Sequence, residues 1–393
     1  MNILLSSCTH WWNAEAHYAA VLAETLREAG HGVWILTRPG TRHAEELVRR
    51  GLPLVTDVPA WEGNPLRFPR LLRELRALQA RLRLDVVDVF RSREFLAHVL
   101  AARKSGVAVV RTRGSSQGVR GHAVNRWLYG SACQGVIASA EVLRRELLTH
   151  LQLPEAHVRT IYYPAEPRAA LGEAGRLADD EEARHFERER LFAELNWAPG
   201  RKLLCIVGRV FPEKGHERLL DALAMLVRLT PDVVLAIADK RYEDEAPYRA
   251  QLERRVLQAG LATQVRWLGF REDVRRIMAC ADVGVIPSLS SEMNCRVAME
   301  FFSVGTPVVA FPTGALPEVV QEGVSGLIAS EPTAESLAGT LRVVLEDEDL
   351  RSRLAAGATH AARHRFSRQA FLAQTLSVFE AARQDAARQA KPH

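Results

Sequence analysis

Several features that mark other classes of protein are scarce in this sequence. Its cysteines are odd in number and form no C-x-x-C pair: Cys8, Cys133, Cys205, Cys280 and Cys295. This pattern favours reduced thiols over a disulfide framework or a zinc site. Gly and Pro interrupt the longer apolar runs, such as 304–311, well short of the roughly 20 residues that span a bilayer. No basic segment precedes the first apolar stretch, so we expect no signal peptide.

Two motifs, one for a metal and one for a nicotinamide cofactor, are also missing. H-E-x-x-H does not occur, and neither early strand is followed by G-x-G-x-x-G with an acidic residue about 20 positions later. The sequence therefore argues against an NAD-dependent oxidoreductase, and we expect no cofactor and no metal. Basic residues are not interleaved with aromatic side chains that would stack on bases, so we expect no nucleic-acid partner. The net charge of +5 is modest and favours anionic ligands or an anionic lipid surface.

What is present is the pattern of an α/β protein. The 393 residues suit two domains of roughly 150–200 residues each. Short aliphatic runs alternate with longer amphipathic stretches, as in βαβ units around a parallel sheet. We predict two Rossmann-like, doubly wound parallel-sheet domains facing a central cleft. Ligands in such folds bind at the carboxyl ends of the strands.

The predicted strands form two series. Those of the first half are Ile3–Ser6, Val33–Thr37, Val86–Phe90, Val107–Thr112, Gly135–Ser139 and Val158–Ile161. Those of the second half are Leu203–Val207, Val233–Ile237, Val265–Trp267, Val283–Ile286 and Pro307–Val309. An early helix is expected over Ala19–Ala29, ending at Gly30. The alternation of predicted strands and helices is interrupted from Pro164 and Pro167 onward, so we predict domains at 1–165 and 201–365. A connection at 166–200, with a helix over about 180–195, separates them, and a helical segment at 366–393 follows.

Two carboxylates follow a strand of the second half. The segment Ser288–Glu300 leads from a strand through a loop into a helix that we expect to start near Asn294. Glu292 lies in the loop and Glu300 about two turns into the helix, so both can face one crevice. A carboxylate accepts two hydrogen bonds from a vicinal diol, and the free amides of a helix start favour a phosphate or hydroxyl group.

Two cations follow the first strand of the same half. The sequence there is Gly208-Arg209-Val-Phe-Pro-Glu-Lys214-Gly215, and a glycine at a strand end lets a ligand approach the backbone. Arg209 and Lys214 would neutralise a diphosphate as it leaves. Two charged residues in a loop are usually only solvated. Arg209 and Lys214, however, precede the Glu292 segment in the sequence, and this order supports a shared site.

These segments resemble the retaining family-4 glycosyltransferases of the GT-B fold, with their E-x7-E region and G-R-x4-K-G element. Gly305-Thr-Pro-Val-Val and Gly314-Ala-Leu-Pro-Glu318 resemble further elements of that family. The resemblance implies that Glu292 contacts the donor sugar, Glu300 holds the ribose hydroxyls, and Arg209 and Lys214 bind the donor diphosphate. The remaining expected donor contacts are Gly208, Asn294, Cys295 and Arg296, with Glu318 supporting the loop. The resemblance also implies that the terminal helix returns to the N-terminal, acceptor-binding domain.

The implied activity is transfer of a sugar, with retention and without metal, from a UDP- or GDP-sugar to a saccharide or lipid-linked acceptor. Lipopolysaccharide or another cell-envelope glycan is the expected product, and the expected location is cytoplasmic. Two alternatives remain open: a sugar-nucleotide epimerase of GT-B shape, and a non-catalytic protein that binds anionic lipid.

The first half departs from the family. Where relatives have a Gly-Gly loop after the first strand, this chain has Ser6-Ser-Cys-Thr-His10-Trp-Trp12-Asn13-Ala-Glu15. His10, Trp12, Asn13 and Glu15 are candidates for contact with the acceptor; equally, Trp11 and Trp12 would pack between domains. Where relatives have a histidine after the fifth strand, this chain has Arg113, a candidate for an anionic acceptor group or the donor phosphate. His122 is a weaker substitute.

A basic amphipathic helix is predicted within residues 64–85. Five leucines recur at helical spacing and six arginines surround them. Such a helix can lie on an anionic membrane surface, which would place the protein peripherally at the inner face of the membrane. More often the leucines face the core and the arginines face water.

Overall fold

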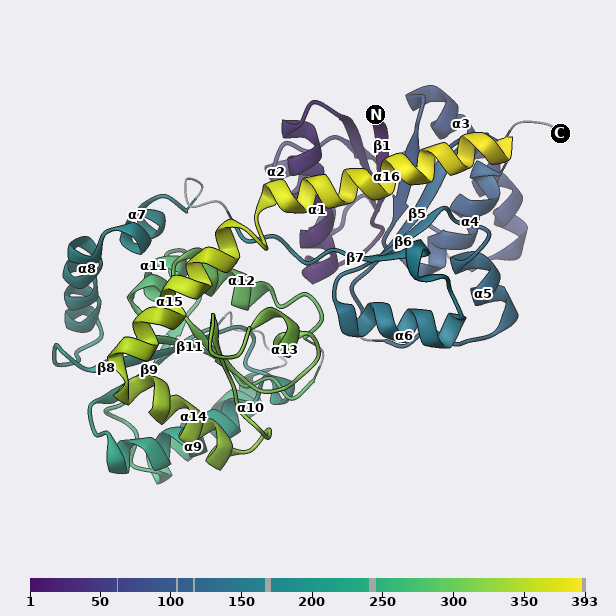
Figure 1. The fold of residues 1–393 in the computed structure, drawn as a ribbon. Coiled ribbons are helices and arrows are strands. Elements are labelled where there is room, and N and C mark those ends of the chain that lie inside the picture. The colour runs from purple at the N-terminus through teal and green to yellow at the C-terminus, as the bar shows by residue number, and fades with distance from the viewer. Residues whose placement is uncertain are drawn as a thin grey trace. The chain divides into compact units, whose positions relative to one another are not determined.

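The computed structural model describes residues 1–61, 63–103, 105–115, 117–166, 171–239, 245–290 and 292–390. Contacts divide the chain into two compact units. Unit 1 comprises Met1–Tyr163 and Gln369–His393, and unit 2 comprises Pro164–Arg368. Each unit is built on a parallel sheet with helices packed around it (Figure 1). The predicted α/β class with two Rossmann-like parallel sheets is confirmed.

The sheet of unit 1 has strand order β3-β2-β1-β4-β5-β6-β7. Its strands are β1 Asn2–Ser6, β2 Gly32–Leu36, β3 Leu54–Val55, β4 Val86–Val89, β5 Ala108–Arg113, β6 Gly135–Ala138 and β7 Val158–Thr160. The six strands predicted in this half are present, each shifted by about one residue at its ends. The prediction missed β3 because two residues are too few to show an alternating pattern.

Helices connect these strands and cover the sheet. They are α1 Ala14–Glu28, α2 Arg42–Arg49, η1 Pro65–Arg67, α3 Phe68–Leu82, α4 Ser92–Ala102, α5 Ala123–Tyr129, α6 Glu141–Leu151, η2 Glu155–His157 and α16 Arg368–Ala390. The start predicted for α1 was wrong: the helix begins earlier because the Asn13 side chain accepts a hydrogen bond from Ala16 N at 2.9 Å. It ends as expected at Gly30, whose φ is +85°. Phe371 of α16 packs edge-on against Tyr18, with ring centroids 5.3 Å apart.

The sheet of unit 2 has strand order β10-β9-β8-β11-β12-β13. Its strands are β8 Lys202–Val207, β9 Val233–Ala238, β10 Val265–Gly269, β11 Val283–Ile286, β12 Val308–Ala310 and β13 Gly326–Ile328. The five strands predicted here are present, and the three-residue β13 was missed. Both faces of the central strand β8 are covered, since its consecutive residues Leu203, Leu204 and Cys205 are all fully buried.

The helices of unit 2 include those of the predicted connection. They are α7 Glu173–Asp179, α8 Glu181–Glu194, η4 Pro212–Lys214, α9 His216–Leu229, α10 Ala246–Gln258, α11 Val274–Cys280, α12 Arg296–Ser303, α13 Leu316–Val319, α14 Ala334–Glu346 and α15 Glu348–Arg363. Helix α8 confirms the helix predicted at about 180–195. Residues 167–170, which include Pro167, and residues 391–393 of the terminal segment lie outside the described residues.

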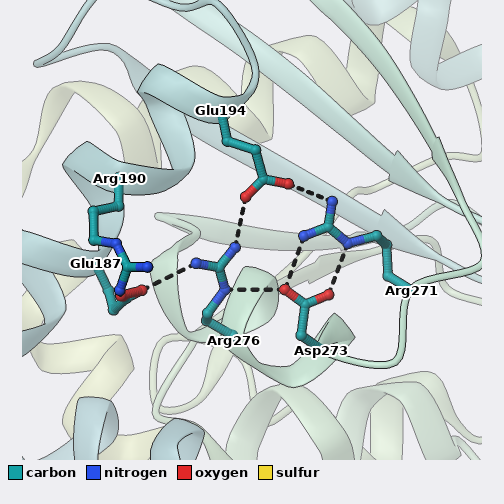
Figure 2. A network of polar contacts seen from close by, with 6 residues as sticks. All are labelled: Glu187, Arg190, Glu194, Arg271, Asp273 and Arg276. Atoms are coloured by element: carbon teal, nitrogen blue, oxygen red, sulfur yellow. Dashed lines mark hydrogen bonds and ion pairs between the residues drawn. The ribbon is translucent and has the colours of Figure 1, made fainter.

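An ion-pair network ties α8 to α11 (Figure 2). Arg276 lies at its centre and contacts Glu187 at 3.0 Å, Glu194 at 2.8 Å and Asp273 at 3.0 Å. Arg271 joins Asp273 at 2.7 Å and Glu194 at 2.5 Å. Because several charges share partners at restricted exposure, the network contributes more than isolated surface pairs would. Helix α8 is therefore an integral part of unit 2.

Candidate functional site

The strand order in unit 2 reverses between β8 and β11. From β8 the chain continues through β9 and β10 on one side, then returns to β11 on the other. In an open parallel sheet a ligand crevice forms outside the carboxyl ends of the strands at such a point. The loop after β8 carries residues 208–214 and the loop after β11 carries residues 287–292. Both sequence motifs therefore reach the same edge of the sheet.

Backbone contacts hold these two loops together. Leu289 N donates a hydrogen bond to Glu213 O at 2.7 Å. Gly215 has a left-handed φ of +72°, and a Cβ at this position would overlap the carbonyl oxygen of Pro287. Only glycine meets both conditions. Gly215 thus fixes the position of Lys214 beside the β11 loop.

Lys214 and Glu292 meet at this edge although they are 78 residues apart in the sequence. Lys214 Nζ forms an ion pair with Glu292 Oε1, and Ser288 Oγ donates to the same oxygen at 2.7 Å. The side chains are 34% and 13% exposed, so the pair remains accessible to a ligand. The structure therefore joins one predicted catalytic residue from each motif.

The segment 314–318 supports the Glu292 loop from behind. Ala315 N donates to Glu292 O at 2.7 Å. Gly314 has φ +57°, and a Cβ there would lie 2.5 Å from the same carbonyl oxygen. Burial, with the nearby carboxylates of Glu292 and Glu318, raises the pKa of the Cys295 thiol well above its usual value. The Cys295 side chain is therefore a neutral packing group at the base of the loop.

Arg209 is held by a carboxylate that the sequence did not reveal. Its guanidinium forms an ion pair with Glu245, which is 4% exposed, while Arg209 itself is 51% exposed. The guanidinium also lies 5.5 Å from the centre of the Phe211 ring. Gly208, with φ +148°, leaves open space beside the backbone. Glu245 was missed because it lies outside any motif, directly before α10.

The start predicted for the helix after Glu292 was wrong. Helix α12 begins at Arg296 rather than near Asn294, because Cys295 adopts a left-handed φ of +45° as the residue before the helix. Glu300 therefore lies just over one turn into the helix instead of two. Its carboxylate contacts Arg296 at 3.2 Å and is 18% exposed. Asn294 Oδ1 is buried without a hydrogen-bond partner among the described residues, so it can accept one from a ligand.

Positive charge at this edge comes from arginine and lysine rather than histidine. Burial, together with Lys214 and Arg249, lowers the pKa of His216 to about 4, so this side chain is neutral at pH 7. Arg249 already has partners, because its guanidinium group pairs with Asp239 and lies 3.9 Å from the centre of the Trp267 ring. Arg209 and Lys214 are thus the exposed cations of the two motif loops. Nothing in the sequence distinguished His216 from a solvated histidine.

The predicted acceptor-binding residues of the loop after β1 lie in unit 1 and differ in their contacts. His10 and Asn13 are exposed, and Asn13 caps α1. Trp12 packs within the unit, 5.4 Å from the His17 ring and 5.0 Å from the Arg50 guanidinium. Trp11 is 71% exposed. Trp12 and Asn13 therefore have structural contacts of their own, whereas His10 and Trp11 are available to a ligand.

The other first-half candidates lie near the ends of α1 and β5. Glu15 approaches Arg91 at 3.8 Å, and burial raises the pKa of its carboxyl group. Arg113 is 5% exposed and donates to Gln117 O. His122 Nδ1 accepts from Asn125 N at 3.3 Å at the start of α5. Arg113 and Glu15 thus lie at the sheet edge, while His122 caps a helix.

The basic segment forms η1 and α3. Leu71, Leu75 and Leu78 are buried, which is the ordinary arrangement of an amphipathic helix. Leu66, in η1, is 90% exposed. The outer face carries arginines, of which Arg70 pairs with Glu74 at 2.8 Å and others point to solvent. Leu71, Leu75 and Leu78 are therefore committed to the core, whereas Leu72 and Leu82 are partly exposed and Leu66 and the arginines face solvent.

Metal-ligating clusters and membrane-spanning helices are both absent from the residues that the structure describes. Among these residues no group of three or more His, Cys, Asp or Glu side chains is placed to hold a metal ion. The sequence contains one D-x-D, Asp347-Glu348-Asp349, but Asp347 Oδ1 accepts from Leu350 N at 2.8 Å and caps α15. Among the helices of the described part, none has an apolar stretch long enough to cross a bilayer.

Two family descriptions match the two halves of the sequence. Residues 16–167 match Glycosyltransferase Family 4, and residues 187–361 match Glycosyl transferases group 1. The second range contains both motif loops, and the first contains Arg91, Arg111 and Arg113 but begins after β1 and the loop that follows it.

Curated relatives match over about half of their length. The chain is 32% identical over 210 residues to D-inositol 3-phosphate glycosyltransferase of Jonesia denitrificans, covering 52% of this chain and 48% of that protein. It is 25% identical over 202 residues to lipopolysaccharide 1,2-N-acetylglucosaminetransferase of Salmonella typhimurium, covering 50% and 53%. The chain thus spans about half the length of these curated relatives.

Solved structures match over nearly the whole chain. A glycosyltransferase from Rickettsia africae superposes with a TM-score of 0.84 at 16% identity, covering 97% of this chain and 98% of that one. HepE of Anabaena, solved in complex with UDP-glucose, has a TM-score of 0.71 at 19% identity, covering 96% and 99%. At these identities the likeness establishes the fold.

Proposed function

The chain belongs to the glycosyltransferases of the GT-B fold and family-4 type, and we propose that it transfers a sugar with retention from a nucleoside-diphosphate sugar. The proposed donor is a UDP- or GDP-sugar, and the proposed acceptor is a saccharide or lipid-linked saccharide of cell-envelope glycan synthesis. The observation that carries the proposal is the Lys214–Glu292 pair at the point where the strand order of unit 2 reverses. The complex of HepE with UDP-glucose supports this choice of donor. The similarity to lipopolysaccharide 1,2-N-acetylglucosaminetransferase supports this choice of product.

The proposed chemistry uses the two cations as phosphate ligands. The bond from the sugar anomeric carbon to the diphosphate oxygen breaks while Lys214 and Arg209 stabilise the charge that develops on the phosphate. The acceptor hydroxyl forms the new bond on the same face, and its proton passes to the departing phosphate oxygen. The diphosphate replaces the carboxylates that Lys214 and Arg209 now hold, which leaves Glu292 free to orient the donor sugar.

The remaining donor contacts surround the start of α12. Glu300 is placed one turn into the helix, and its carboxylate would accept hydrogen bonds from the ribose hydroxyls. Asn294 Oδ1 lacks a partner in the described structure and is proposed to bind a donor hydroxyl. Cys295 and Arg296 contribute backbone amides at the helix start, and Gly208 gives the phosphates access to the backbone. We propose that the reaction needs no metal, since Arg209 and Lys214 supply the countercharge.

The experiment that tests this proposal follows the donor itself. Purified protein is incubated with UDP-glucose or GDP-mannose in EDTA, and released sugar and nucleotide are followed by proton NMR before the sugar anomers equilibrate. Release of the α-anomer with free nucleoside diphosphate is the expected result. The β-anomer would overturn retention. A changed sugar still joined to its nucleotide would favour the epimerase alternative, and dependence on added magnesium would overturn metal independence.

A peripheral membrane position is a further part of the proposal. Leu66 and the arginines of the η1–α3 segment face solvent, and clustered arginines bind anionic headgroups. A lipid-linked acceptor would then be reached from the membrane surface. Because Leu71, Leu75 and Leu78 of α3 are buried, we propose electrostatic attachment rather than insertion of the helix.

A further inference from the structure

The strand order of unit 1 also reverses, between β1 and β4. The same rule that locates the donor site in unit 2 places a ligand crevice outside the carboxyl ends of β1, β4 and β5. Three arginines gather there: Arg91 follows β4, and Arg111 and Arg113 belong to the end of β5. All three act electrostatically on the Glu15 carboxyl group, so they lie around one point.

Arg111 and Arg113 are unusually buried for cations. They are 2% and 5% exposed, and the Nε atom of each lacks a hydrogen-bond partner among the described residues. Arg111 is fixed in place, since it donates to Val89 O at 2.7 Å and to Ser92 Oγ at 3.2 Å. A buried charge is costly unless it is paired. The arrangement is therefore incomplete without a further negative group.

Glu15 already pairs with Arg91, but no carboxylate of the described residues forms an ion pair with Arg111 or Arg113. Glu15 is 3.8 Å from Arg91, and Glu94, which is 4% exposed, forms no ion pair with a described residue. Burial raises the pKa of both carboxyl groups. Burial also raises the pKa of Asp88 to about 7, and Asp88 is engaged with Thr112 at 2.8 Å. The buried guanidinium groups of Arg111 and Arg113 therefore lie without an ion-pair partner among the described residues.

Two further observations show that the crevice favours anions. Helix α4 begins beside Arg91, and that residue gives the helix no side-chain cap within the described structure. The first amides of the helix therefore add a positive partial charge. Burial alone would raise the pKa of Tyr129, yet Arg111 and Arg113 bring it below its usual value. Arg111 and Arg113 act on the Tyr129 hydroxyl group through their charge and through hydrogen bonds.

We propose that Arg91 and Arg113, with the start of α4, bind an oxyanion carried by the acceptor, namely a phosphoryl or carboxylate group. Arg91, which is 40% exposed, makes the outer contact, Arg113 forms the floor, and Arg111 positions Arg113. This inference rests on the proposed function, because it assumes that unit 1 holds the acceptor. It narrows the acceptor to an anionic saccharide.

The test uses the full chain with Arg209→Ala and Lys214→Ala, so that phosphate cannot bind at the donor loops. Calorimetry measures binding of glucose 6-phosphate, glucuronate and glucose at fixed ionic strength. Arg91→Ala is compared with Arg93→Ala, a matched control at an exposed arginine two residues later on the same helix start. Circular dichroism checks that each variant is folded.

One or both anionic sugars should bind, glucose should bind much more weakly, and Arg91→Ala should weaken the anionic sugar about tenfold or more. Arg93→Ala should leave binding unchanged. A preference for glucose 6-phosphate would identify a phosphoryl group, and a preference for glucuronate a carboxylate. Equal binding of all three sugars, no binding, or equal losses in both variants would overturn the inference. Failure of the proposed function would show separately, as loss of UDP-sugar binding by the unsubstituted chain.

Discussion

Lys214 and Arg209 are held differently although both are proposed to bind the donor phosphates. Lys214 pairs with Glu292, so its removal changes the environment of the residue proposed to orient the sugar. Arg209 pairs with Glu245, which has no proposed contact with the donor. At the scale of single residues, Lys214 is therefore the more informative substitution.

Lys214→Ala should lower turnover about a hundredfold or more, because a preorganised cation at the leaving phosphate is lost. The melting temperature should change little, since Glu292 keeps its hydrogen bond from Ser288. Donor turnover and thermal unfolding measure the two effects. Lys202→Ala, at the opposite end of the same strand β8, is the matched control and should retain activity. Equal rates for the two variants would remove Lys214 from the mechanism.

Gly215→Ala should destabilise the protein by more than about 3 kcal/mol, because it combines a left-handed backbone with overlap at Pro287 O. Gly260→Ala is the control for backbone conformation alone. Its φ is +70° and its surroundings are open, so about 1–2 kcal/mol is expected. Chemical denaturation measures both free energies of unfolding. Similar values for the two variants would show that the two loops do not approach as described.

Candidate site residues could be proposed from the sequence where a motif contained them. Arg209, Lys214, Glu292 and Glu300 stand in a recognisable order and spacing. Glu245 and the unsatisfied Glu94 could not be found, because their importance comes from partners, or from the lack of partners, that only the fold creates.

At the scale of elements, the network around Arg276 predicts how acid affects unit 2. Arg271 lowers the pKa of Asp273 from 3.8 to about 2, so ionised Asp273 stabilises the folded state. A lowered folded pKa gives stability that is complete above about pH 4 and is lost as the pH falls toward 2. Unfolding free energy should therefore decline steeply in this window.

Asp273→Asn should reduce stability at neutral pH and flatten the decline between pH 4 and 2, since the titrating group is gone. Asp349→Asn, at an exposed position on α15, should leave the profile unchanged. Urea denaturation at a series of pH values gives the comparison. A profile in Asp273→Asn as steep as in the unsubstituted protein would contradict the role of this ion pair.

The η1–α3 segment makes a second prediction at this scale. Arg67→Glu combined with Arg73→Glu should weaken binding to phosphatidylglycerol vesicles more than tenfold, because each arginine near an anionic surface contributes about 1 kcal/mol. Arg228→Glu with Arg254→Glu, in unit 2, makes the same change in net charge and should have little effect. Vesicle sedimentation measures the binding. Equal losses from both pairs would indicate general charge attraction instead of a specific surface.

Most elements could be predicted from periodicity, and the failures have local causes. Strands β3 and β13 are too short to show a pattern. Helix α12 starts late because Cys295 adopts a left-handed conformation that its residue type does not suggest. Helix α1 starts early because Asn13 caps it, a signal that was present in the sequence but not used.

At the scale of the whole molecule, the two units differ in how far the sequence explains them. Unit 2 carries motifs that resemble the family, so the residues of its candidate site could be proposed one by one from the sequence. Unit 1 follows the family only as strands and helices, and its loops after β1 and β5 depart from the usual residues. Both sheets nevertheless reverse their strand order once, and the residues proposed to bind the donor phosphates and the acceptor oxyanion lie at those two points.

The central claim is that the loops after β8 and β11 form a nucleotide-sugar site. Calorimetric titration with UDP-glucose, GDP-mannose and the free nucleotides, in EDTA, tests it most directly. The account predicts that one nucleotide sugar binds, that Arg209→Ala and Lys214→Ala weaken it about tenfold or more each, and that Lys202→Ala does not. Absence of binding to every UDP and GDP ligand, or equal binding by all variants, would contradict the account.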